Sequence, residues 1–329
     1  MESLNTLRWN RIKESGIQFT YIKSIVKNLY DYEVKENNID SFINNIKDYK
    51  NIEEGILILN IEKDIYRKLR IFSMKDLKKY DKHPIEEVLT NPMFKMVFEN
   101  KNRINIKDGI FDKDDLDTCY RVIYFNEKSN IFEFRLACIK RSIEIVRDEI
   151  GCEDEIETHI YDSVKFIIDL NKNLVFMFYN DILSGNFKAN IEASNRKKAF
   201  MNLFDNVSMK NLIAFDISKN LSNYFKIYIQ EIDKGNPKKL ISIIETMCTL
   251  DKKNSLNSTA DDFKHAPIRL EAIKYAIDNE DHDIATLECI VNSRNVRLRS
   301  GGYITLQDST FKMEVIKDVW KEFFEWYKK

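Results

Sequence analysis

The order of apolar and polar positions predicts helices first and a strand next. Residues 1 to about 50 are expected to be helical, because apolar side chains such as Tyr21, Ile25 and Leu29 recur at three-to-four spacing. The run GILILNI, which begins at Gly55, has the length and β-branched content of a buried strand. The following IYRKLRIF is predicted to be a strand in which apolar and basic residues nearly alternate.

The middle of the chain predicts two hairpins. The segments CYRVIYF and IFEFRLACI alternate in polarity and flank the polar turn NEKSN. The segments SVKFIIDL and LVFMFY flank Asn171–Asn173, and asparagine tolerates the positive φ of tight hairpins. Between the hairpins, SIEIVRDEI is expected to form a helix. The acidic stretch Cys152–His159 is expected to be a domain boundary, since apolar periodicity stops there.

Short helices and strands are expected to alternate from Asn195 to Leu250. LIAFDI and FKIYIQEI are predicted strands, and the basic segment NRKKAFMNLF is a predicted helix start. The polar stretch DKKNSLNSTADD is typical of a linker.

The last quarter of the chain predicts a winged-helix-like module. Helices are expected over Pro267–Asn279 and Ile284–Ser293, followed by the hairpin NVRLRSGGYITL with its turn at Gly301–Gly302, and by an amphipathic closing helix. The expected fold class is therefore α+β, built of antiparallel hairpins and helices in two or three modules. The predicted domains are an N-terminal α+β domain at 1–150, a central α+β domain at 151–255 and the winged-helix-like module at 256–329.

Composition narrows the possible functions. The chain has 52 Lys and Arg residues against 53 Asp and Glu residues, a net charge of -1, so a nucleic-acid surface would have to be local. With 8 glycines in 329 residues, the sequence contains neither a P-loop nor a GxGxxG fingerprint, and no cofactor is expected. The 5 cysteines form no CxxC pair, and no segment resembles a signal peptide or a membrane span, which favours a cytoplasmic protein.

Basic residues of the predicted hairpin are the main functional candidates. Arg297 and Arg299 sit at strand period and are expected on one side of a protruding ribbon, where guanidinium groups can reach phosphates. The alternative is an edge ribbon whose arginines blunt its open side or pair with nearby acids such as Glu280, Asp281 and Asp283. The full set of predicted nucleic-acid-binding residues is Arg294, Arg297, Arg299, Arg196, Lys197 and Lys198.

A metal-dependent nuclease is the enzymatic alternative. It would use Asp81 and Glu99 to hold Mg²⁺ and Lys101 to steady the attacking water or phosphate. Otherwise no catalytic centre is expected. The scattered histidines and the acidic loop FDKDDLD lack metal-ligand spacing, so no metal site is predicted.

The closing helix carries a continuous apolar seam. It packs against its own module or serves as a dimer or partner interface, and the latter would make the protein an interaction subunit. The seam residues are Met313, Ile316, Trp320, Phe323 and Tyr327.

The order of elements in the second half resembles the KwaB family of the bacterial Kiwa anti-phage system. The similarity lies in SVKFIIDL, LVFMFY and NRKKAFMNLF, and then in IRLEAIKYAI, RNVRLRSGGYITL and the helix from Phe311. The resemblance implies a cytoplasmic DNA-binding defence protein. It also implies a small integral-membrane partner and a homo-oligomeric state.

Overall fold

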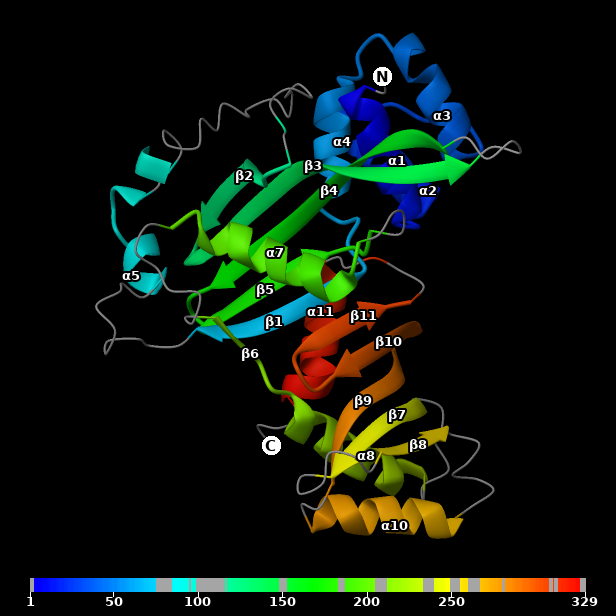
Figure 1. The fold of residues 1–329 in the computed structure, drawn as a ribbon, viewed down its shortest axis with the longest axis vertical. Coiled ribbons are helices and arrows are strands. Elements are labelled where there is room, and N and C mark those ends of the chain that lie inside the picture. The colour runs from blue at the N-terminus through cyan, green and yellow to red at the C-terminus, as the bar shows by residue number, and fades with distance from the viewer. Residues whose placement is uncertain are drawn as a thin grey trace. The chain divides into compact units, whose positions relative to one another are not determined.

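The computed structural model divides the chain into two compact units (Figure 1). Unit 1 comprises Met1–Tyr66 and Ser73–Ile213, and unit 2 comprises Arg67–Phe72 and Ala214–Lys329. Both are α+β with mostly antiparallel strands, which confirms that part of the predicted fold class. The structure describes residues 3–74, 85–94, 96–98, 116, 118–147, 153–182, 187–204, 212–232, 240–248, 255–259, 267–279, 282–307, 310 and 313–325.

Unit 1 begins with a group of helices. Two of them start with side-chain caps, since Ser3 Oγ accepts from the Thr6 amide at 3.2 Å and Asn38 Oδ1 accepts from the Ser41 amide at 2.8 Å. The strand predicted for GILILNI is wrong, because this apolar run is helix α4. A short run buried on all sides shows neither period, so its sequence does not separate helix from strand. The helices are α1 (Leu4–Glu14), α2 (Phe19–Tyr30), α3 (Ile39–Asn45), the 3₁₀ turn η1 (Ile46–Asp48) and α4 (Glu54–Glu62).

The unit 1 sheet contains both predicted middle hairpins, in the order β2, β3, β4, β5. Asn130 and Asn173 have φ of 63° and 57° in their turns, as expected of asparagine in tight hairpins. The further elements are β2 (Arg121–Lys128), β3 (Ile131–Arg147), β4 (Glu153–Asp169), β5 (Leu174–Tyr179), α5 (Ile85–Leu89), α7 (Ala189–Met201) and β6 (Leu212–Ala214), whose last residue belongs to unit 2.

The long β3–β4 pair changes two expectations. The first six residues of SIEIVRDEI form a strand and not a helix, because β3 continues to Arg147. The register runs without a break from Ile131 opposite Asp169 to Arg147 opposite Glu153. The domain boundary predicted at residue 151 therefore falls between two paired strands. Ile143, Ile145 and Ile156 are exposed in this part of the pair, which forms an exposed ribbon.

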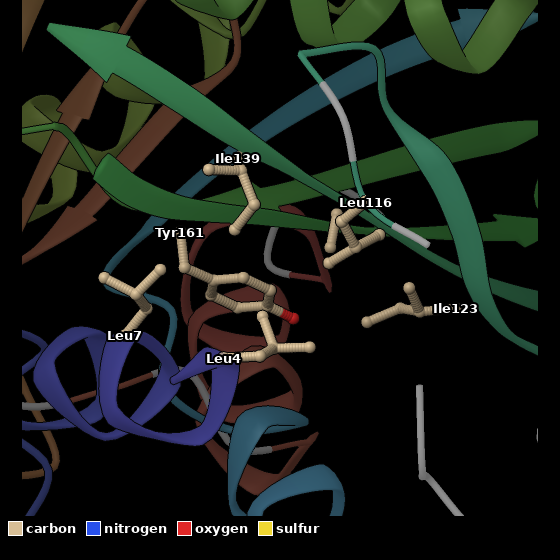
Figure 2. Packing of buried hydrophobic residues seen from close by; sticks show 7 residues of the cluster. Leu4, Leu7, Leu116, Ile123, Ile139 and Tyr161 are labelled. Atoms are coloured by element: carbon tan, nitrogen blue, oxygen red, sulfur yellow. The ribbon is translucent and has the colours of Figure 1, made fainter. Parts of the chain in front are cut away.

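A buried cluster joins helix α1 to the sheet of unit 1. In Figure 2, Leu4 and Leu7 of α1 point toward Tyr161 of β4 and Ile139 of β3. The ring of Tyr161 lies in the middle of the group. Apolar burial of this kind is the main stabilising term of a domain. The cluster comprises Leu4, Leu7, Leu116, Ile123, Ala137, Ile139 and Tyr161.

A buried ionic group centres on Asp162, the next residue of β4. Arg196 of α7 donates to the Asp162 carboxylate at 2.8, 2.9 and 3.1 Å, Arg11 of α1 lies 3.6 Å away, and the Tyr120 hydroxyl also donates to it. Burial acts to raise the pKa of the Asp162 carboxyl, but the two guanidinium groups outweigh it and hold this pKa below its usual value. The Asn180 carbonyl accepts from both arginines, at 3.0 and 3.2 Å.

Helix α7 lies across the strands of unit 1 (Figure 1). Besides Arg196, it contributes Phe200, whose ring stacks on Phe166 of β4 at a centroid distance of 3.9 Å and an angle of 9°. The segment NRKKAFMNLF is helical up to Met201, as predicted.

Unit 2 has a sheet with strand order β1, β11, β10, β9, β7, β8. The predicted hairpin and the helix over Pro267–Asn279 are confirmed. The elements are β1 (Lys68–Met74, of which the last two residues belong to unit 1), α8 (Ser218–Ile232), β7 (Leu240–Cys248), β8 (Ser255–Thr259), α10 (Pro267–Asp278), β9 (His282–Val291), β10 (Arg294–Arg299), β11 (Tyr303–Leu306), α11 (Met313–Trp320) and the π-helical turn η4 (Lys321–Glu325).

Three predictions for unit 2 are wrong. FKIYIQEI is part of helix α8, and the expected linker contains strand β8. The predicted second helix of the winged-helix module is strand β9, which pairs with β10 on one side and β7 on the other. Without that helix, the described residues of the C-terminal region do not show the helix-turn-helix order that defines a winged-helix module.

None of the helices that the structure describes is long and apolar enough to cross a membrane.

Candidate nucleic-acid interface

One face of the unit 2 sheet carries two rows of mostly basic and polar side chains. The register aligns Lys68 of β1, Thr305 of β11, Arg297 of β10 and Glu288 of β9 in the first row. It aligns Arg70, Tyr303, Arg299 and Thr286 in the second row. Residues directly opposite each other in antiparallel strands project to the same side. We call these eight residues the basic face.

The alternate residues of the same strands form the apolar core of unit 2. Because side chains alternate along a strand, these residues project to the side opposite the basic face. All of them are buried, so this side of the sheet is apolar. They are Leu69, Leu287, Cys289, Val296, Leu298, Ile304 and Leu306.

The basic face carries a local excess of positive charge in a chain of net charge -1. Four of its residues are cations (Lys68, Arg70, Arg297 and Arg299), and Glu288 is its one carboxylate. Arg297 Nε donates to Glu288 Oε1 at 2.5 Å, and Gln307 donates to the same oxygen at 3.1 Å. Arg299 is exposed and forms no ion pair with any residue that the structure describes.

Arg70 and Tyr303 form a stacked pair in the second row. The guanidinium carbon of Arg70 lies 4.4 Å from the centroid of the Tyr303 ring and 4.9 Å from that of Phe72. The Arg70 Nε atom is buried and has no hydrogen-bond partner among the described residues. The guanidinium is therefore held in place by ring contacts.

The turn between β10 and β11 is anchored within unit 2. The Ser300 amide donates to the Ala285 carbonyl at 2.8 Å, and the Ser300 carbonyl accepts from the Ile217 amide at 2.8 Å. The hairpin lies inside the sheet, with β1 beside β11 and β9 beside β10. The predicted protruding ribbon is thus wrong, although its strand pairing and its turn are correct.

The three hairpin arginines do not act as one group. Arg294 has the parity of the buried residues Val296 and Leu298, and its Nη1 lies 3.3 Å from Asp318 of α11. Arg297 and Arg299 have the opposite parity and belong to the basic face. The predicted pairing of arginines with acids holds for Arg294 and Arg297, but the acids are Asp318 and Glu288.

The predicted basic cluster at the start of the NRKKAFMNLF segment belongs to unit 1. Arg196 is buried against Asp162, so its guanidinium is not available to a phosphate in solution. Lys197 donates to the Leu212 carbonyl at 2.7 Å, and Lys198 is exposed. Of these three residues, Lys198 alone presents an exposed cation.

Asp81, Glu99 and Lys101, the residues of the nuclease alternative, lie outside the described residues. In the part of the chain that the structure describes, no group of three or more His, Cys, Asp or Glu side chains could hold a metal ion.

The closing helix has a different buried side from the predicted seam. Val315, Val319 and Phe323 are buried, whereas Ile316 and Trp320 are partly exposed. Phe323 lies in the π-helical turn, and its ring is 4.6 Å from that of Tyr224 in α8. The predicted seam is thus internal at Phe323. Tyr327 lies outside the described residues, and the Met313 side chain is not among those described.

Sequence reasoning missed Lys68, Arg70 and Tyr303. The near alternation of basic and apolar residues in IYRKLRIF was a signal for the first two, since it predicts a strand with one basic side. Their place beside β11 depends on a pairing between residues more than two hundred positions apart, which local periodicity does not encode.

A scan of protein-family models gives no match to this chain, and a search of curated proteins finds no significantly similar sequence.

Proposed function

We propose that this protein binds nucleic acid, DNA in particular, through the basic face of unit 2. The observation that carries the proposal is the register of β1, β11 and β10, which aligns four cations from two strands on one side of a sheet. Lysine and arginine gain affinity for a nucleic acid by neutralising phosphates and releasing condensed counterions. The proposed role is non-catalytic binding, and we assign no residue to catalysis.

The direct test compares two arginines of the same strand. Arg299→Ala removes an exposed cation from the basic face, whereas Arg294→Ala removes the same charge from the other side of β10. Filter binding to a DNA duplex at about 50 mM and about 200 mM salt measures affinity and salt slope. We expect Arg299→Ala to weaken binding and reduce the slope by about 1, and Arg294→Ala to match the wild type.

Equal affinity and slope for wild type and Arg299→Ala would reject the basic face as the binding surface. A loss in Arg294→Ala as large as in Arg299→Ala would do the same, because it would reflect net charge or folding. Circular dichroism of both variants checks that the sheet is intact.

The biological setting that we propose is bacterial anti-phage defence, and it rests on the resemblance to the KwaB family. In that setting the protein works with a small membrane-protein partner and restricts phage growth. A plaque assay on cells that express the wild type, Arg299→Ala or Arg294→Ala tests it. Protection by wild type and Arg294→Ala, and its loss with Arg299→Ala, would link defence to the basic face. Absence of protection by the wild type with its neighbouring genes would oppose this setting.

Protein interaction is a second candidate function, because β3 exposes two isoleucines on one side. Ile143 is 57% exposed and Ile145 is 61% exposed, and the register of β2 with β3 extends only from Lys128 to Arg121, opposite Ala137. Exposed apolar side chains on a ribbon with open edges favour pairing with another copy of the chain. We therefore propose homo-oligomerisation through this ribbon.

Light scattering of an Ile143→Thr, Ile145→Thr double variant tests the ribbon, with Ile191→Thr as a control at an exposed isoleucine of α7. The double variant should be smaller than the wild type, and the control should not. An oligomer that survives in the double variant would exclude the ribbon as the interface.

A further inference from the structure

The width of the unit 2 sheet decides which form of nucleic acid the basic face can accept. The major groove of B-DNA is about 12 Å wide and admits an α-helix or a two-stranded ribbon. The basic face spans β1, β11, β10 and β9, and four strands spaced about 4.8 Å apart cover roughly 14 Å between their outer axes before side chains are added. Because β10 and β11 are flanked on both sides, the hairpin cannot enter a groove alone.

A single strand can lie flat on such a face. Its bases are unpaired, so they can stack on planar side chains while the phosphates meet cations. The basic face offers both kinds of group. Arg70 and Tyr303 provide the planar groups, and Arg299 is the residue directly opposite Tyr303 on the next strand.

The aromatic platform is fixed before any ligand binds. Tyr303 follows Gly302, which has φ of 76°, and a Cβ on Gly302 would lie 2.7 Å from the Phe215 carbonyl oxygen and 2.9 Å from that of Ile71. This close approach requires glycine and locks the turn against two segments. A side chain at Gly301 would meet the Tyr303 ring at 3.4 Å, so the ring lies directly over the turn.

Arg70 extends the platform across to β1. Its guanidinium carbon lies 4.4 Å from the centroid of the Tyr303 ring and 4.9 Å from that of Phe72. A planar guanidinium stacks on bases as an aromatic ring does, and it also donates to phosphate or base oxygens.

We propose that the basic face binds single-stranded nucleic acid, with a base stacked on the Tyr303 and Arg70 platform and the adjoining phosphates on Arg299, Arg297 and Lys68. The inference rests on the proposed function and specifies its substrate class. The shared chemistry is an unpaired base next to a phosphodiester, which single-stranded DNA and RNA both supply.

The experiment measures fluorescence anisotropy of three labelled probes of about 20 nucleotides: single-stranded DNA, single-stranded RNA and a DNA duplex of the same sequence. The wild type should bind at least one single strand more tightly than the duplex. Tyr303→Leu should weaken single-strand binding about 5-fold to 150-fold, because stacking on one aromatic side chain has this magnitude. Tyr303→Phe should retain the binding, because it keeps an aromatic ring. The comparison of the DNA and RNA strands identifies which of the two nucleic acids the protein prefers.

A readout on the wild type alone guards against a folding defect in the variant. A strand that carries 5-iodouridine is cross-linked by light, and mass spectrometry locates the attachment site. Cross-links should fall on the peptide that contains Tyr303. Cross-links confined to other peptides would overturn the inference.

The outcomes separate the two proposals. If Arg299→Ala weakens all probes equally and Tyr303→Leu changes none, the basic face binds phosphates without stacking, and the single-strand inference fails alone. If neither variant changes the affinity for any probe, or if the wild type binds no probe, both proposals fail.

Discussion

Replacing Asp162 by asparagine should destabilise unit 1 strongly, because the carboxylate is buried among two cations. Arg196 donates to Asp162 at distances from 2.8 to 3.1 Å, and Arg11 lies 3.6 Å away. Both guanidinium groups and the carboxylate are almost fully buried. Asp162→Asn keeps the size of the side chain but removes the carboxylate that both buried arginines share, so that Arg11 keeps only its pair with Glu14 at 3.0 Å.

The magnitude follows from the fate of the partners that remain. Removing one member of a buried ion pair costs about 3–5 kcal/mol, since the other charge stays buried and uncompensated. Asp162→Asn should lie in this range, because both arginines lose their shared carboxylate. Arg196→Met should cost less, since Asp162 then keeps Arg11 and the Tyr120 hydroxyl.

Urea unfolding followed by circular dichroism measures the effect. For a slope of about 2–3 kcal/mol per molar, the Asp162→Asn midpoint should fall by about 1–2.5 M. Asp40→Asn is the matched control, because Asp40 is exposed and its pair with Lys13 at 3.1 Å should contribute about 0.2–1 kcal/mol at most. An Asp162→Asn midpoint equal to that of Asp40→Asn would refute the assignment of this group as a buried, charged network.

Three further predictions concern the turn of unit 2 and two titrating groups of unit 1. Gly302→Ala should lower the free energy of unfolding by more than 1 kcal/mol, because its Cβ would meet two carbonyl oxygens within 3 Å at positive φ. The control is Gly301→Ala, whose Cβ would meet only the Tyr303 ring at 3.4 Å and which should cost less in the same urea assay. The folded protein holds the pKa of Asp162 below the unfolded value of about 3.9, so the stabilising effect of the carboxylate is complete above about pH 3.9 and is lost as pH falls through the folded pKa. Wild type should therefore lose more stability than Asp162→Asn between about pH 5 and pH 2. Burial lowers the pKa of Lys165 to about 8, whereas the unfolded value is about 10.4, so between these pH values the unfolded chain binds more protons than the folded one and stability rises with pH. The unfolding free energy of wild type minus that of Lys165→Met should therefore increase from about pH 8 to about pH 10. A constant difference would contradict this prediction.

Local pattern predicted the elements whose polarity has one clear period. The strands on either side of Asn130 alternate in polarity, and asparagine at positive φ closes the turns at Asn130 and Asn173. Strand β5 is apolar throughout, and the asparagine turn before it is what identified it as part of a hairpin. The errors fall where the period is missing or shared. The run GILILNI is apolar throughout and is a helix, whereas the segment that becomes β9 is rich in Ile, Leu and Val and suits either structure.

The closing helix shows that apolar spacing does not always identify the buried side. The predicted seam included Ile316 and Trp320, which are partly exposed. The buried residues are Val315, Val319 and Phe323, which are four residues apart and also share one face of a helix. Because both series have helical spacing, the sequence alone does not decide which one faces the interior.

For the candidate interface, the sequence could predict only which residues of one strand lie on the same side. That Arg297 and Arg299 share a side follows from a period of two residues, and the structure confirms it at β10. Arg294, which was predicted to bind with them, lies on the other side and pairs with Asp318. The other half of the basic face comes from β1, whose residues reach Thr305 and Tyr303 through a long-range pairing. Because of this pairing, the hairpin is part of a wide sheet and not a free ribbon. A free ribbon could bind in a DNA groove, whereas the wide sheet is better suited to bind a single strand on its flat surface. The chemistry of the arginines was readable from the sequence, whereas the form of ligand they suit depends on the strand beside them.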